Sequence, residues 1–124
     1  MLFRSLRYMY NPDLDGYSKG CYVSTLGKLD VHYSSGVANH FFYLLAEGST
    51  SASTNTCSTG LSVTGIGRSK AELIWYRALT VYMTSSTNYA GARTATLSAA
   101  ADLYGNGSVE YNEVANAWSA VKVN

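Results

Sequence analysis

Apolar residues recur at helical spacing between Ser34 or Ser35 and Gly48. Apolar side chains three or four residues apart share one face of an α-helix. A serine can cap the start of this helix and Gly48 can end it. The pattern therefore predicts an amphipathic helix, whose buried face carries the following residues: Val37, Phe41, Leu44 and Leu45.

The same spacing predicts a second helix from about Arg68 to Met83. Ser69 is followed three residues later by Glu72, which is the pattern of a capping box. The apolar stripe expected to face the core is as follows: Ala71, Ile74, Trp75, Ala78 and Tyr82.

Two further helices are predicted in the C-terminal third, over 89–104 and 108–121. Glycines 105 and 107 should end the first of them, which is rich in alanine and so has high helix propensity. The inward positions expected on the first are Thr96, Leu97, Ala100 and Leu103. Those on the second are Val114, Ala117, Trp118 and Val121.

The remaining stretches lack this spacing. Residues 1–33 contain turn signals, and residues 48–64 form a loop rich in serine and threonine. We find no internal repeat and no linker between two folding units. The expected fold is all-α: a compact orthogonal bundle of about four to five helices with an irregular N-terminal segment, in one domain over 1–124.

Composition narrows the possible partners. The net charge is +1 and only 14% of residues are charged, which gives no electrostatic reason to expect nucleic acid or an anionic membrane as a partner. No run of 18 apolar residues is present, so we expect no span across a bilayer. The first residues, MLFRSLRYMYNP, carry two arginines with no apolar run behind them, so they are not interpreted as a signal peptide.

The sequence contains neither H-E-x-x-H nor C-x-x-C. Its two histidines, His32 and His40, are eight residues apart, which is not the i, i+4 spacing that chelates zinc on one helix face. No metal site is therefore expected from this chain's own residues.

A calcium loop is the main alternative. Residues 102–113 match the EF-hand loop at positions 1, 5, 6, 8 and 12, with Asp102 first and Glu113 last. Tyr104 stands at position 3, where the loop needs an oxygen ligand, and the predicted third helix runs through Asp102. We therefore favour a helix-turn-helix, and keep as the alternative a non-enzymatic helical binding module that binds calcium through 102–113.

His32 lies just before the first predicted helix, where its side chain can project into a cleft and donate a hydrogen bond to a developing oxyanion. A lone histidine in that position is more often a structural or surface residue.

The two cysteines, Cys21 and Cys57, are in predicted loops. They could form a disulfide or remain free thiols, and neither spacing nor composition decides between these.

Two longer motifs occur in the first third of the sequence: L-R-x-M-x-x-P over 6–12 and V-H-x-x-S-G-V-x-N over 31–39. Three further motifs follow, over 63–68, 75–80 and 100–105. In this order, the motifs resemble the C-terminal half of the thermolysin-like metallopeptidases, Streptomyces type.

The resemblance implies a secreted zinc metalloendopeptidase with its zinc between two lobes. The zinc ligands, H-E-x-x-H and structural calcium would belong to an N-terminal lobe, preceding residue 1, and that lobe would be the partner of this one. His32 would stabilise the tetrahedral intermediate. Arg7 would bind a carbonyl of the peptide or protein substrate, and Leu6 would line an apolar pocket. The chain alone should be inactive.

The resemblance also implies a disulfide between Cys21 and Cys57. One position departs from the family pattern, because Gly27 stands where an aspartate usually orients the catalytic histidine. Asp30 precedes His32 by two residues, so in an extended stretch both side chains point the same way. Asp30 is therefore a candidate to orient His32, against the alternative that it is a solvated turn residue.

Overall fold

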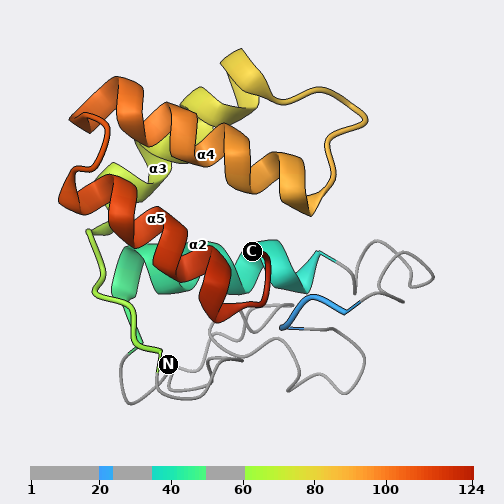
Figure 1. Cartoon of the computed structure of the whole chain (residues 1–124), viewed down its shortest axis with the longest axis vertical. Coiled ribbons are helices and arrows are strands. Elements are labelled where there is room, and N and C mark those ends of the chain that lie inside the picture. Colours follow the sequence, from blue (N-terminus) through green and yellow to red (C-terminus); the bar gives the residue numbers. More distant parts are fainter. Residues whose placement is uncertain (1–19, 24–34, 50–60) are drawn as a thin grey trace, which may run out of the picture.

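The computed structural model describes residues 20–23, 35–49 and 61–124. Within these ranges the chain forms four α-helices and one π-helical turn, with no β-strand (Figure 1). Their bounds are α2 Gly36–Glu47, α3 Arg68–Arg77, η4 Ala78–Tyr82, α4 Tyr89–Tyr104 and α5 Val109–Ala120. The predicted all-α class is confirmed.

The helices pack around one apolar core. In Figure 1, α4 and α5 run side by side, α2 lies along the other side of α5, and α3 packs behind α4. The rings of Phe41 from α2 and Trp118 from α5 stack at the centre, with centroids 3.8 Å apart and planes 9° apart. Both side chains are at most 1% exposed, so this stack joins the first and last described helices.

The buried face of α2 is the predicted one. Its four apolar positions are each at most 1% exposed: Val37, Phe41, Leu44 and Leu45. Gly48 ends the helix at φ 83°, a left-handed conformation that favours glycine, and donates its N–H to the Leu44 carbonyl at 2.7 Å.

The start of α2 corrects one prediction. Ser35 does occupy the N-cap position, but its side chain forms no capping hydrogen bond. Its backbone is helical, with φ −70° and ψ −9°, whereas a capping serine normally has an extended backbone that aims its hydroxyl at the first-turn N–H groups.

The capping box predicted for α3 is also wrong. Gly67 is the N-cap, at φ 95°, and as a glycine it forms no side-chain capping bond. Ser69 lies inside the helix, one residue after its start at Arg68, and so its hydroxyl is not placed to bind the N3 amide.

The π-helical turn η4 changes which side of the second helix is buried. Met83 donates its N–H to the Ala78 carbonyl at 2.9 Å, an i to i+5 bond that adds a residue to the turn. Ala71, Ile74 and Ala78 are fully buried as predicted, but Tyr82 is 41% exposed. The stripe fails at Tyr82 because the wider turn rotates it away from the core.

Helices α4 and α5 agree with their predicted bounds. All four inward positions of α5 are fully buried, and Ser108 caps the helix by accepting a hydrogen bond from the Tyr111 amide at 3.1 Å. On α4, Thr96 and Ala100 are buried and Leu97 is partly buried. Leu103 is 40% exposed, contrary to prediction, whereas its neighbour Tyr104 packs against the core.

Arg93 fastens the C-terminal end of the chain to α4. Its guanidinium donates to the carbonyls of Ala115 and Val123, at 3.1 and 2.9 Å, and to the Ser119 hydroxyl at 3.4 Å. Partial burial lowers the pKa of Arg93 from its ordinary value.

Among the described helices, none combines the length and the hydropathy of a membrane-spanning segment.

Candidate functional site

Most of the predicted site residues fall outside the described ranges. These are Leu6, Arg7, Asp30, His32 and Cys57. Cys21 and all of α2 are described, and α2 begins four residues after His32 in the sequence.

The first turn of α2 is firmly held. Gly36 and Val37 are buried, and Asn39 donates its N–H to the Ser35 carbonyl at 3.1 Å. The amide of Ala38, the third residue of the helix, donates to the phenol oxygen of Tyr89 at 3.3 Å. Tyr89 thus supplies the side-chain cap that Ser35 does not, from 51 residues away in the sequence.

Tyr89 is itself fixed by packing. It is the first residue of α4, next to Asn88, whose side chain accepts a hydrogen bond from the Gly91 amide at 2.8 Å and so caps that helix. Its ring makes edge contacts with Tyr22 and Trp118, with centroids 6.0 and 6.1 Å away. Burial raises the pKa of the Tyr89 phenol, so the group stays neutral over a wide pH range.

Residues 20–23 are anchored at two points. The buried His40 side chain binds the Gly20 carbonyl through Nδ1 at 2.9 Å, and the Tyr22 amide donates to the Val121 carbonyl at 2.8 Å. Because a carbonyl only accepts, Nδ1 carries the proton in this bond. His40 therefore has a structural partner, and the half-buried Cys21 lies between the two anchors.

The described residues on either side of 50–60 are hydrogen-bonded to each other. The Ser49 amide donates to the Val63 carbonyl at 2.9 Å, and the Val63 amide donates to the Ser49 hydroxyl at 2.8 Å. Next to these bonds, the backbones at Gly48 and Gly65 approach so closely that a Cβ on Gly65 would lie 2.6 Å from the Glu47 carbonyl carbon. Only glycine fits at this crossing.

The two end carboxylates of the candidate calcium loop are engaged elsewhere. Asp102 accepts hydrogen bonds from the Tyr82 hydroxyl and from Arg77 Nε, the latter at 2.8 Å, and these bonds lower the pKa of its carboxyl. Glu113 accepts from the Thr64 amide at 2.9 Å and from the Asn116 side chain at 3.3 Å. Among the described residues, no three His, Cys, Asp or Glu side chains are grouped as a metal site would require. This geometry does not support the calcium loop.

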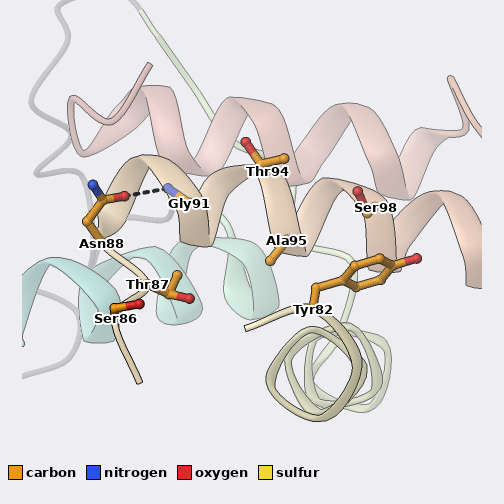
Figure 2. A pocket seen from close by; sticks show the side chains of 8 residues that line it. All are labelled: Tyr82, Ser86, Thr87, Asn88, Gly91, Thr94, Ala95 and Ser98. Carbon is orange, nitrogen blue, oxygen red and sulfur yellow. Dashed lines mark hydrogen bonds between the residues drawn. The ribbon is translucent and has the colours of Figure 1, made fainter. Parts of the chain in front are cut away.

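A shallow pocket of about 380 Å³ lies between α4 and the segment after η4 (Figure 2). Hydroxyl, amide and small side chains line it: Tyr82, Ser86, Thr87, Asn88, Gly91, Thr94, Ala95 and Ser98. Figure 2 shows the hydroxyls of Ser86 and Thr87 coming from the loop and those of Thr94 and Ser98 from α4. The lining contains no histidine, cysteine, carboxylate or cation.

Sequence reasoning missed Tyr89 as a residue of this region. Its only sequence signal was its place at the start of a predicted helix, which does not reveal that its hydroxyl reaches another helix. The contact depends on where the fold places the start of α4 relative to the first turn of α2.

Comparison with known proteins shows what the chain is similar to. Residues 2–123 match the family described as thermolysin metallopeptidase, alpha-helical domain. The chain is 53% identical over 124 residues to the transglutaminase-activating metalloprotease of Streptomyces mobaraensis, covering 95% of this chain and 16% of that protein. It is 44% identical over 123 residues to the thermolysin of Alicyclobacillus acidocaldarius, covering 96% of this chain and 21% of the relative. The chain thus spans about a fifth or less of the length of these relatives.

Proposed function

Because this chain belongs to the thermolysin metallopeptidases, as their alpha-helical domain, we propose that it is the C-terminal lobe of a secreted zinc metalloendopeptidase. In this proposal His32 stabilises the oxyanion of the tetrahedral intermediate, Arg7 binds a substrate carbonyl, and Leu6 lines an apolar pocket. The observation that carries it is the match over residues 2–123, which includes the whole V-H-x-x-S-G-V-x-N motif.

The described scaffold suits this role for His32. The histidine precedes the N-cap of α2 by three residues, and α2 is pinned to the core by the stack of Phe41 on Trp118. A donor that is fixed before the reaction pays no reorganisation cost as charge builds on the substrate oxygen, which is why such donors contribute strongly to the rate. A well-packed helix that begins four residues after the histidine supports that function.

The described residues do not fit a zinc site, since they contain no grouped set of metal-binding side chains. The zinc ligands and the structural calcium therefore belong, in this proposal, to the N-terminal lobe. That lobe would be the partner of this one, and a peptide or protein the substrate.

Two finer features belong to the same proposal. Asp30 orients the imidazole of His32 and keeps its pKa high, in place of the aspartate that Gly27 replaces. Cys21 and Cys57 form a disulfide that ties residues 20–23 to the loop over 50–60. In support, the described residues include no free cysteine, and Cys21 is held between two backbone anchors.

Substitution of His32 tests the catalytic role. In the full-length peptidase, His32→Gln should lower kcat about 100- to 1000-fold, because one oxyanion donor is lost, while KM changes little. Asp30→Asn should lower kcat less and should shift the alkaline limb of the kcat/KM profile to lower pH. Both variants should melt at the wild-type temperature, as should the control Tyr76→Phe, whose side chain is 68% exposed.

A His32→Gln enzyme with wild-type kcat would remove the assigned role of this histidine. An unchanged pH profile in Asp30→Asn would reject the orienting role of Asp30 alone.

A further inference from the structure

The cap of α2 comes from a different helix. Ser35 makes no side-chain capping bond, and the amide of Ala38 instead donates to the Tyr89 hydroxyl at 3.3 Å. We propose that Tyr89 is a positioning residue for His32: it holds the first turn of α2, and through it the backbone that presents the imidazole. This inference rests on the proposed function of His32.

The first turn of α2, which Tyr89 contacts, is close to His32 in the sequence. The first amides of a helix have no partner within the helix, and the first turn frays when they are not satisfied. Ser35, the N-cap of α2, follows His32 by three residues, so fraying of this turn releases the backbone from which His32 extends. Small displacements of a catalytic group lower the rate steeply, by about 100-fold for 1 Å in unfavourable cases.

Tyr89 is itself held in place and can therefore restrain the first turn of α2. Its ring is held by edge contacts with Tyr22 and Trp118, and Trp118 in turn stacks on Phe41 of α2. Tyr22 is anchored to the C-terminal end by its bond to Val121. The phenol oxygen is therefore presented to Ala38 by a rigid set of rings, and its neutral state makes it a pH-independent acceptor.

Exchange of Tyr89 for phenylalanine removes the acceptor and keeps the ring. In the full-length peptidase, Tyr89→Phe should lower kcat by roughly 3- to 10-fold, the range expected for loss of one hydrogen bond, with KM changed less than about twofold. Hydrogen exchange at the Ala38 amide should become faster. The matched control is Ser108→Ala, which removes the cap of α5 and should leave kcat unchanged.

A double substitution separates positioning from general destabilisation. If Tyr89 acts through His32, then Tyr89→Phe should have no effect on kcat in a His32→Gln background. If it acts only on the stability of the fold, kcat should fall by the same factor in both backgrounds, and the inference is then wrong.

Substitution of His32 and substitution of Tyr89 test the catalytic role and the positioning role separately. Wild-type kcat in His32→Gln overturns the proposed function itself. A large loss in His32→Gln together with wild-type kcat in Tyr89→Phe leaves the proposed function standing and overturns only the role of Tyr89.

Discussion

Arg77, Tyr82 and Asp102 form one hydrogen-bonded group on the surface between η4 and α4. The carboxylate of Asp102 accepts from both other side chains, and it remains 34% exposed while Arg77 is 41% exposed. Exposed ion pairs contribute little to stability individually, but here the pair also holds the π-helical turn against α4. The sequence did not indicate this group, because Tyr82 was predicted to be buried.

At the residue scale, Asp102 should make stability depend on pH. Its hydrogen bonds with Tyr82 and Arg77 lower its folded-state pKa below the ordinary value of 3.8. A lowered carboxyl pKa stabilises the fold above the unfolded-state pKa, and the contribution is lost as the pH falls through the folded-state pKa. Thermal unfolding followed from about pH 6 to about pH 3 should therefore show a smaller decrease of Tm for Asp102→Asn than for the wild type. Parallel Tm curves would show that Asp102 is not a source of this dependence.

At the scale of the elements, the segment over 61–67 closes the end of α2. The amides of Ile66 and Gly67 donate to the carbonyls of Leu45 and Ala46, at 2.9 and 3.0 Å, and so satisfy groups that the end of a helix leaves without partners. The close approach of Gly48 and Gly65 makes these bonds possible. Glycine was expected to end α2, but its partner Gly65 could not be inferred from the local pattern.

Gly65→Ala should therefore destabilise the fold by about 1–3 kcal/mol, because the added methyl meets backbone atoms that cannot move aside. Its Cβ would lie 2.7 Å from the Ala46 carbonyl oxygen. Urea denaturation of the chain measures the change. The control is Gly91→Ala in α4, where the nearest atoms are side-chain atoms of Thr87 and Asn88 at 3.1 and 3.3 Å, and where alanine favours the helix. Equal stability of the two variants would contradict the importance of the crossing.

At the scale of the whole molecule, the chain resembles one part of a larger enzyme. The relatives named above contain several times its length, and the described residues group no metal ligands. The helical core nevertheless has its own large buried side chains, among them Trp118, Phe41 and Ile74. In the proposed enzyme, the N-terminal lobe holds the metal and this lobe supplies the oxyanion donor.

The purified chain should accordingly fail to cleave casein, and cleavage should appear when the metal-bearing lobe is supplied with it. Calorimetry should show no binding of calcium, because Asp102 and Glu113 both accept hydrogen bonds from protein groups. Casein cleavage by the pure chain would contradict the division between lobes. Calcium binding with an affinity of about 1 μM would instead favour the binding-module alternative.

Local sequence determined the helices. The bounds of α4, the cap of α5 by Ser108 and the buried face of α2 all follow from spacing and capping preferences, which act within a few residues. The family also followed from the sequence, because its motifs are contiguous strings.

The tertiary structure alone decided three other features: the exposure of Tyr82, the crossing at Gly65 and the cap of α2 by Tyr89. The first depends on an added residue in the π-helical turn, and the other two on the approach of segments distant in the chain. Hydrophobic periodicity indicates which side of a helix is apolar, but not which other element that side contacts. The partner of the Ala38 amide is therefore decided by where the fold places the start of α4 relative to α2.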